Sequence, residues 1–345
     1  MALPVFDLHC DTADRLAWQS LPADLRASCG SDFYGPGDEG DPAGCRGLAS
    51  NRGHVSLEKI GAVAWAQCFA CFMPDELSPT DAVRFCDHVL GYLRAQVAAN
   101  EGRVALAGRA DRIRDVLAGG RVAAVLTLEN ARLFAADLGL VERLAGEGLL
   151  MASLSWNAAG PLASGHDTHG HLTSLGVSAL AEMERAGVVL DVSHLNDECF
   201  DDVVARSGRP FVASHSNARA VCGHPRNLTD RQFLQIRERG GVVGLNYCRG
   251  FIVEGCWDQD PARVTFEDVA AHVEHWLDLG GEDVVALGGD YDGSDVPAFL
   301  DGADTMPAFQ GLLVERFGET VAAKLCGENA LAFFERAAHG YVSKV

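Results

Sequence analysis

The sequence predicts an α/β protein folded as a (β/α)8 TIM barrel, and two observations carry this prediction. Short apolar runs alternate with longer segments whose apolar residues recur at helical spacing. Glycine-rich connections precede several of these runs, at positions where a helix should end. The rhythm shows no linker, so we expect one barrel domain over residues 1–345. Eight predicted strands begin near Pro4, Ala62, Val122, Leu149, Gly187, Pro210, Gly241 and Val284.

The first strand closes on two side chains that bind metals in many proteins. His9 and Asp11 lie two residues apart, so a strand directs both to the same face. An insertion from Ser20 to Gly53, rich in Gly, Asp, Pro and Ser, follows. Because a barrel places its site where strands end and loops begin, this insertion is either a lid or a surface excursion.

The second strand carries a pair of cysteines at a spacing that also occurs in redox proteins. Cys68 and Cys71 lie within an apolar run rather than at the start of a helix. Residues three apart on a strand point to opposite faces, which favours a structural role for both thiols. A helix is predicted from Thr80 to Ala99, before the third strand.

The later strands end on further polar side chains. The fourth is the exception because it ends on Trp156 and Asn157, and an insertion with two histidines, from Ala158 to Gly170, follows it. A helix is predicted from Phe266 to Leu279, ahead of the last strand. The third, fifth, sixth and eighth strands end on Glu129, His194, His215 and Asp290.

These strand endings predict a metal site. Imidazole and carboxylate groups are ligands for borderline metals such as Zn²⁺. One such histidine is as often a core or surface residue as a ligand. Their joint placement at strand ends makes coincidence a poor explanation and brings them to one end of the barrel.

Composition excludes several classes of protein. The 28 Lys and Arg residues against 48 Asp and Glu give a net charge of -20 without a basic stripe, which disfavours nucleic acid. No apolar run reaches the roughly 18 residues of a membrane span, and neither a signal peptide nor a lipid anchor is evident. Eleven scattered cysteines do not resemble a disulfide framework. We expect a reduced, cytoplasmic protein without a membrane partner.

A set of short motifs along the chain resembles the amidohydrolase superfamily and, within it, the membrane (renal) dipeptidase family, peptidase family M19. The resemblance extends over nearly the whole chain, to Glu328-Asn329, and its last four motifs are together highly specific. The motifs are Asp7-Leu-His-Cys-Asp11, His54-Val55, Leu128-Glu129, Leu172-Thr173, Asp191-Val-Ser-His194, Ser214-His-Ser216, Pro225-Arg-Asn227 and Gly288-Gly-Asp-Tyr-Asp-Gly293.

The resemblance implies two Zn²⁺ ions per chain. His9 and Asp11 would bind one ion, His194 and His215 the other, and Glu129 would bridge them. Many binuclear relatives use a carboxylated lysine as the bridge. Here the lysines, Lys59, Lys324 and Lys344, end no predicted strand. If two metals bind, a carboxylate must therefore bridge them, which disfavours lactonase and phosphotriesterase relatives.

The resemblance also implies a mechanism. A hydroxide shared by the two ions would attack the peptide carbonyl, since bound Zn²⁺ lowers the pKa of water toward neutrality. Asp290 is similar to the family's proton-transfer carboxylate and would pass the proton to the leaving amine; Asp292 is the expected structural neighbour. Arg226 is similar to the family's arginine for the C-terminal carboxylate, which a guanidinium fork suits.

Two positions depart from the family pattern. Trp156 stands where renal-type members have a histidine that contacts the substrate carbonyl, and an indole cannot titrate. Trp156 or Asn157 takes over part of that role, or His166 or His169 folds in from the following loop, although a solvated position is the commoner outcome for either. Asn130 follows Glu129 where the family usually has glycine, which we expect to reshape the pocket floor.

The expected function is that of a zinc-dependent dipeptidase acting on small dipeptides of L,L or L,D configuration. Two alternatives stay open. One is an N-acyl amino acid hydrolase of the same superfamily. The other is a metal-binding barrel that has lost turnover, which the change at Trp156 motivates. Retention of Asp290 and Arg226 favours an enzyme. Both a monomer and a homodimer fit the sequence.

Overall fold

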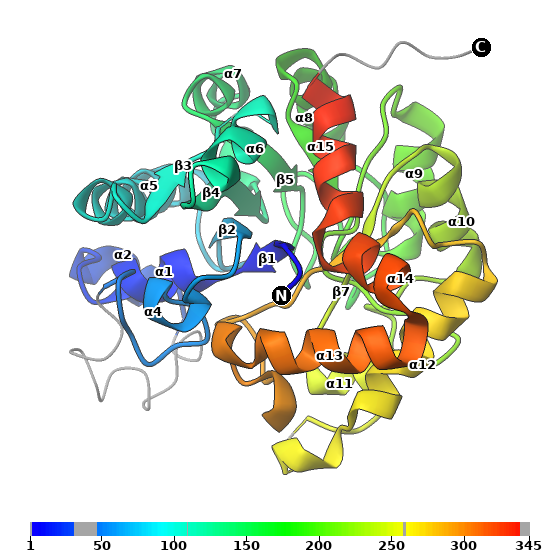
Figure 1. Cartoon of the computed structure of the whole chain (residues 1–345). Coiled ribbons are helices and arrows are strands. Elements are labelled where there is room, and N and C mark those ends of the chain that lie inside the picture. The colour runs from blue at the N-terminus through cyan, green and yellow to red at the C-terminus, as the bar shows by residue number, and fades with distance from the viewer. Residues whose placement is uncertain (1, 31–46, 109, 258–259, 339–345) are drawn as a thin grey trace.

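A ring of parallel strands forms the centre of the molecule, and helices surround it (Figure 1). The computed structural model describes residues 2–30, 47–108, 110–257 and 260–338. The central strands are short and almost entirely buried, as expected for parallel strands covered by helices. The strands are β1 (Val5–Cys10), β2 (Trp65–Phe72), β3 (Val104–Leu106), β4 (Val122–Glu129), β5 (Leu149–Ser153), β6 (Val189–Asp191), β7 (Val243–Leu245) and β8 (Val285–Leu287).

The predicted (β/α)8 architecture is confirmed, because the strands follow one another around a ring. The sheet order is β6, β5, β4, β2, β1, β8, β7, and all pairs are parallel. Strand β1 joins β8 at Asp7 and Leu287. Between β6 and β7, Val212 pairs with Asp191 and Ala213 pairs with Val243 through isolated bridges. This short segment completes the ring.

Two differences from the predicted strands have a physical cause. The run that begins at Pro210 was expected to form a full strand, but it contributes only single-residue bridges before the chain turns at Ser214. The prediction also missed β3, whose three residues are too few to show a period. β3 pairs with the first residues of β4, and β5 pairs with the later ones, so β3 adds no position to the ring.

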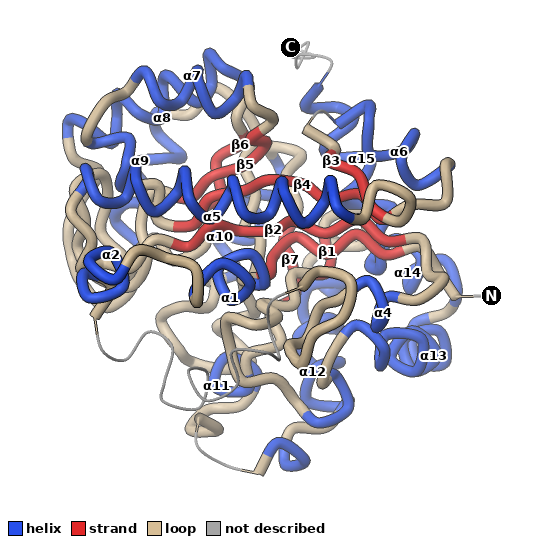
Figure 2. The backbone as a smooth tube through the Cα atoms, turned by 90° about the vertical axis from the view of Figure 1, so that its left-hand side faces the viewer, coloured by secondary structure: helices blue, strands red, loops and turns tan. Residues whose placement is uncertain are grey.

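The helices pack around the sheet, and Figure 2 shows α5 running along one side of the strands. The predicted helices at Thr80–Ala99 and Phe266–Leu279 are confirmed as α5 and α12. Helix α8 ends where Gly187 adopts a left-handed φ of 77°, a conformation that favours glycine. The helices are α1 (Thr12–Trp18), α2 (Ala23–Ser28), α4 (Leu57–Ile60), α5 (Pro79–Ala99), α6 (Ala110–Ala118), α7 (Gly139–Gly146), α8 (Ser174–Ala186), α9 (Asp197–Arg206), α10 (Asp230–Glu238), α11 (Arg249–Ile252), α12 (Phe266–Asp278), α13 (Met306–Phe317), α14 (Glu319–Ala323) and α15 (Asn329–Ala338).

The insertions expected after the first and fourth strands differ in how much the structure shows. Residues 31–46 of the predicted insertion from Ser20 to Gly53 lie outside the described residues, and helix α2 occupies part of its beginning. The second insertion is described in full. It crosses the end of the barrel between β5 and α8, and Gly165 pairs there with Leu195 just after β6.

The cysteine pair on β2 is structural, as predicted. Cys68 and Cys71 are both fully buried free thiols. They belong to different apolar clusters, since Cys68 packs in the smaller cluster with Leu8 and Val125, whereas Cys71 packs in the larger one with Cys86. Opposite faces of the strand therefore separate them. Within the described residues, no helix is both long enough and apolar enough to cross a bilayer.

Candidate metal centre

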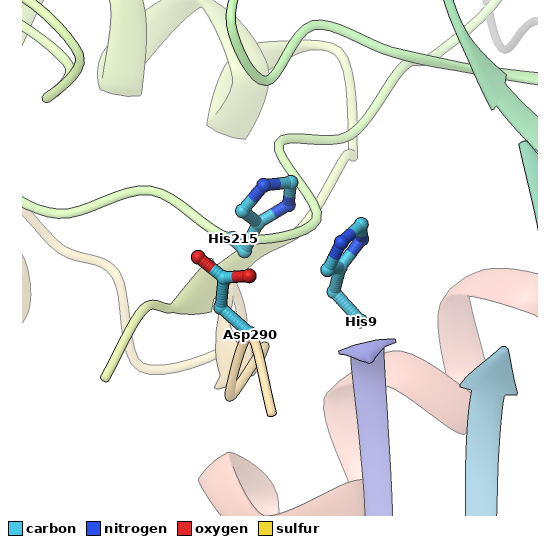
Figure 3. Close-up of side chains that lie close together, drawn as sticks. All are labelled: His9, His215 and Asp290. Carbon is cyan, nitrogen blue, oxygen red and sulfur yellow. The ribbon is translucent and has the colours of Figure 1, made fainter. Parts of the chain in front are cut away.

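The five predicted metal ligands lie together in the structure. Their ligand atoms form two overlapping groups, each within 4.8 Å: His9, Asp11 and Glu129 make one group, and Glu129, His194 and His215 the other. All five residues are buried. The barrel brings them together because each follows or ends a strand at the same edge of the sheet. Asp290 belongs to a third such group with His9 and His215, and Figure 3 shows these three side chains converging from different segments.

The carboxylate of Glu129 lies between the two groups. Its Oε2 atom is 3.1 Å from Nε2 of His9, and its Oε1 atom is 2.8 Å from Nε2 of His194. Glu129 ends β4 and is therefore held by a fully buried strand. One carboxylate thus faces a different imidazole with each oxygen, which is the geometry that a bridging ligand requires.

Two imidazole nitrogens face each other without a hydrogen between them. Nδ1 of His194 donates to the Oδ1 atom of Asn157 at 3.0 Å, which leaves Nε2 as a bare lone pair. Nδ1 of His215 donates to the hydroxyl of Ser214 at 2.7 Å, so its Nε2 is bare as well. These two Nε2 atoms are only 2.9 Å apart. Lone pairs at that distance repel unless a cation lies beside them, so the residues present fit a metal.

Two other ligand atoms support the same conclusion. Nε2 of His9 and Oδ1 of Asp11 are buried and form no hydrogen bond among the described residues, although Nε2 of His9 lies 3.1 Å from Oε2 of Glu129. A buried polar atom without a partner costs about 1–3 kcal/mol, and such atoms are rare in folded proteins. Metal coordination would satisfy both. The mixture of imidazole and carboxylate donors suits Zn²⁺ and similar borderline metals.

Burial disfavours the charged forms of Glu129, Asp290, His194 and His215. For His9 burial acts in the same direction, but the carboxylates of Asp11 and Glu129 prevail and raise its pKa. Burial raises the pKa of Glu129 to about 7, where His9 opposes the shift, and it also raises the pKa of Asp290. Burial lowers the pKa values of His194 and His215 well below their usual range. Both imidazoles are therefore neutral and able to act as ligands, and a divalent cation would favour the ionised carboxylates.

A hydrogen-bonded relay orients His215. The hydroxyl of Ser214 donates to Oδ2 of Asp191, at the end of β6, and accepts from Nδ1 of His215. Oδ1 of Asp191 accepts from the backbone N–H groups of Ser193 and Ser214. Partners of this kind fix the tautomer and direction of a metal-binding histidine. The relay explains why these residues accompany the ligands in the sequence motifs.

Asp290 is held by a residue that the sequence did not single out. Its Oδ2 atom accepts from Nδ2 of Asn246, which follows β7, at 3.1 Å. Asp292 is structural, as expected, because it accepts from the hydroxyl of Thr12 and from the backbone N–H of His54. Asn246 gave no signal in the sequence because a single asparagine after a strand is common.

The backbone is strained at this centre. Among the described residues, the non-glycine residues with positive φ are Asn130 at 56°, His194 at 72°, Asp290 at 57° and Asp292 at 66°. Two of these are predicted site residues, and the other two are close in sequence to Glu129 and Asp290. Left-handed residues are costly for side chains other than glycine and concentrate at functional sites.

Asn130 explains one departure from the family pattern. Its position needs a left-handed backbone, which glycine adopts without strain and asparagine tolerates better than most residues. Its side-chain amide turns away from the metal ligands and donates to the carbonyl of Met73 at 2.7 Å and to Oδ1 of Asp75 at 2.9 Å. Asn130 thus ties the end of β4 to the segment after β2.

A cavity of about 800 Å³ opens over the metal ligands. Trp156 and Asn157 line it, and Trp156 lies edge-on to Phe72 with ring centroids 4.9 Å apart. Asn157 also accepts a hydrogen bond from Nδ1 of His194, so its amide positions one of the predicted metal ligands. Four residues of the predicted site also line this cavity: Asp11, Glu129, His194 and Asp290.

The two loop histidines behave differently. His166 folds into the cavity, where its side chain is 4% exposed and its ring lies 5.7 Å from that of His194. Burial and nearby Arg226 lower the pKa of His166 to about 3, so the ring is neutral. His169 is 94% exposed and pairs with Glu198. A long loop hides such contacts from the sequence, since its path is set by distant residues.

Arg226 lies beside the centre and is buried rather than solvated. Its two terminal nitrogens donate to the hydroxyl of Ser216 and to the carbonyl of His215, both at 2.7 Å. The guanidinium therefore braces the segment that carries His215. Each terminal nitrogen has a second hydrogen that it can donate to a carboxylate, so this position is compatible with the predicted role of Arg226.

Comparison with known proteins identifies similar metallopeptidases. A family model described as membrane dipeptidase (peptidase family M19) matches residues 1–341. A solved metallopeptidase from Rhodobacter sphaeroides, liganded with a phosphinate mimic of the dipeptide L-Ala-D-Ala, is 29% identical. It superposes with a TM-score of 0.83 over 98% of this chain and 100% of that chain.

Two further proteins resemble this chain. A solved dipeptidase, described as a metallopeptidase of family M19, is 31% identical with a TM-score of 0.84 and covers 98% of this chain and 99% of its own. The dipeptidase verJ of Clonostachys rogersoniana is 28% identical over 285 residues, which are 76% of this chain and 69% of that protein.

Proposed function

Since this chain belongs to the membrane dipeptidase family, peptidase family M19, we propose that it is a binuclear zinc dipeptidase that hydrolyses small dipeptides of L,L or L,D configuration. The observation that carries this proposal is the carboxylate of Glu129, whose oxygens approach His9 and His194 at 3.1 and 2.8 Å. A dipeptide mimic bound to the R. sphaeroides relative supports the substrate class.

The ligand sets support two ions. His9, Asp11 and Glu129 would hold one, and Glu129, His194 and His215 the other. When bound, two Zn²⁺ ions would supply Lewis acidity and an activated water near neutral pH. The ligand residues are buried at the base of the cavity, which strengthens electrostatic interactions with a substrate.

Asp290 would move the proton during hydrolysis. It lines the cavity and lies with His9 and His215 within the cluster, so its carboxylate would be near both an activated water and the substrate nitrogen. Asn246 donates to Oδ2 and leaves Oδ1 for the proton. The carboxylate would accept the proton from the water and deliver it to the leaving amine.

Arg226 would receive the C-terminal carboxylate of the dipeptide. The positive charge is buried near Asp290, where a carboxylate would interact with it strongly. The charge of Arg226 would also select dipeptides over longer peptides, because a longer peptide would place its C-terminal carboxylate elsewhere. Trp156 and Asn157 line the cavity and would contact the substrate.

The decisive experiment measures metal content and hydrolysis on the same sample. Purified protein should hold two zinc ions per chain by mass spectrometry and should cleave members of a dipeptide panel. Asp290→Asn should keep both ions and lose at least about 100-fold in kcat. Asp115→Asn, an exposed aspartate on α6, is the matched control and should match the wild type. Two bound ions without cleavage of any dipeptide would refute the proposed activity.

Substrate preference distinguishes the proposed dipeptidase from an N-acyl amino acid hydrolase. Efficient cleavage of N-acetyl amino acids with no cleavage of dipeptides would favour that alternative.

For Arg226, the wild type should cleave a dipeptide far better than its C-terminal amide, and Arg226→Lys should lose much of this discrimination. Equal discrimination in both proteins would exclude a role for Arg226 in carboxylate binding.

Location and assembly remain predictions. The ten cysteines of the described residues are free and buried, which supports a reduced environment. Cell fractionation would test the expected cytoplasmic location. Light scattering would distinguish the monomer from the homodimer.

A further inference from the structure

Three aromatic rings form one wall of the cavity above the metal centre. They are His224, Phe251 and Trp257, and we call them the aromatic wall. The ring centroids lie 4.9 Å apart for His224 and Phe251, 5.4 Å for His224 and Trp257, and 5.1 Å for Phe251 and Trp257. All three residues line the cavity. They come from the segment before α10 and from α11 and the loop that follows it, so distant parts of the chain assemble the wall.

Trp257 is exposed, yet its position is fixed. The side chain is 41% exposed, which is unusual for so large an apolar group. Its ring lies against the backbone at Gly250, where an added Cβ atom would overlap the indole. Phe251 and His224 contact the same ring from the sides. A large apolar surface that faces a cavity and is held in place by its neighbours is typical of a binding surface.

His224 is also fixed, and its ring is neutral. Nδ1 accepts from the backbone N–H of Arg226 at 3.1 Å, which assigns the proton of the neutral ring to Nε2. Burial is the largest of the effects that lower the pKa of His224. The ring therefore offers a flat, uncharged face rather than a cation, in keeping with its two aromatic neighbours.

The wall lies next to Arg226. The guanidinium carbon is 5.7 Å from the ring centroid of Phe251. His166 connects the wall to the metal ligands, because its ring is 5.7 Å from both His224 and His194. A dipeptide whose carboxylate is held by Arg226 would place the side chain of the same residue beside Phe251, since both groups branch from one Cα atom.

We propose that the aromatic wall is the subsite for the side chain of the C-terminal residue and that it selects large apolar side chains, above all aromatic ones. This inference rests on the proposed dipeptidase function and specifies its substrate class. Aromatic pairs stack face-offset or edge-on at the ring distances seen within the wall, and a substrate ring would extend that arrangement. Ala-Phe should therefore be a better substrate than Ala-Ala or Phe-Ala.

The test compares these three dipeptides in four proteins. Trp257→Ala should lower kcat/KM for Ala-Phe about 10-fold and should leave Ala-Ala and Phe-Ala within about two-fold. Gly250→Ala, which displaces the ring of Trp257 without removing it, should show the same pattern. Leu312→Ala is the control, because Leu312 is an exposed apolar residue on α13 that does not line the cavity.

The outcomes separate this inference from the proposed function. An equal loss on all three dipeptides, or a preference for Phe-Ala in the wild type, would overturn the assignment of the wall. Cleavage of Ala-Ala by the wild type shows that the dipeptidase function holds in either case. Calorimetric binding of Ala-Phe and Ala-Ala to zinc-loaded Asp290→Asn, with and without Trp257→Ala, tests the wall independently of turnover, because Asp290→Asn suppresses hydrolysis of the titrated dipeptide. Equal affinities in both proteins would refute it.

Discussion

Replacing Asn130 should separate the cost of its left-handed backbone from that of its hydrogen bonds. The side-chain amide donates to the carbonyl of Met73 at 2.7 Å and to the carboxylate of Asp75 at 2.9 Å. Asn130→Gly and Asn130→Ala both remove these bonds. A neutral hydrogen bond contributes about 1 kcal/mol and one to a charged group about 1.5 kcal/mol, so the loss of these bonds should cost each variant about 2.5 kcal/mol.

Alanine should keep a backbone cost that glycine avoids. Holding φ at 56° costs a residue with a Cβ atom about 1.5 kcal/mol. About 0.5 kcal/mol is recovered because alanine restricts the unfolded chain more than glycine does. Asn130→Ala should therefore be about 1 kcal/mol less stable than Asn130→Gly. Because Asn130 itself carries a Cβ atom and already bears the backbone cost, the total loss should be about 2.5 kcal/mol for Asn130→Ala and about 1.5 kcal/mol for Asn130→Gly.

Urea unfolding followed by tryptophan fluorescence measures both differences. A chelator should be present throughout, so that metal binding does not contribute to the free energy of unfolding. Equal stabilities of the two variants would refute the backbone argument. If both variants stayed within about 0.5 kcal/mol of the wild type, the hydrogen bonds of Asn130 would be refuted as a source of stability.

Three further predictions address the centre and its surroundings. Glu129→Gln should hold fewer than two zinc ions and lose at least about 100-fold in kcat/KM; retention of two ions would exclude the bridge. Ser214→Ala should weaken zinc binding about 10-fold to 100-fold in a competition titration with a chelator, because His215 loses its orienting partner, whereas unchanged affinity would contradict the relay. Burial lowers the pKa of His272 from 6.5 to about 4, although its hydrogen bond to the Ile252 carbonyl opposes the shift. The neutral ring accepts from Ala218 N–H and donates to that carbonyl. The depressed pKa contributes stability above pH 6.5 that is lost as the pH falls toward 4, by up to about 3 kcal/mol, and His272→Gln should show a shallower decline over this range in urea unfolding.

Much of the centre could be predicted from the sequence because a barrel converts strand endings into neighbours. His9, Glu129 and His215 are far apart in the chain, yet each ends a predicted run, and parallel strands bring those ends to one edge. The same rule located Asp290. Its left-handed backbone was not predictable, since aspartate is not restricted to that conformation.

The residues that position the ligands were harder to predict. The contact between Asn157 and His194 depends on the path of the chain after β5, and the bond from Asn246 to Asp290 joins two different loops. Neither contact follows from local periodicity. His166 shows the same limitation, because its burial is decided by how the whole insertion crosses the barrel end.

The join between β1 and β8 links metal binding to closure of the ring. This join consists of the paired position of Asp7 with Leu287 and the bridge between Cys10 and Tyr291, together with backbone bonds such as that from Asp290 N–H to the His9 carbonyl. His9 and Asp290 therefore stand on opposite sides of the place where the first and last strands meet. A chain whose ring is open would carry the predicted ligands on separate pieces, so we expect it to bind metal weakly. Metal occupancy should therefore report complete assembly, and we expect a partly folded chain to stay inactive until its two ends have met.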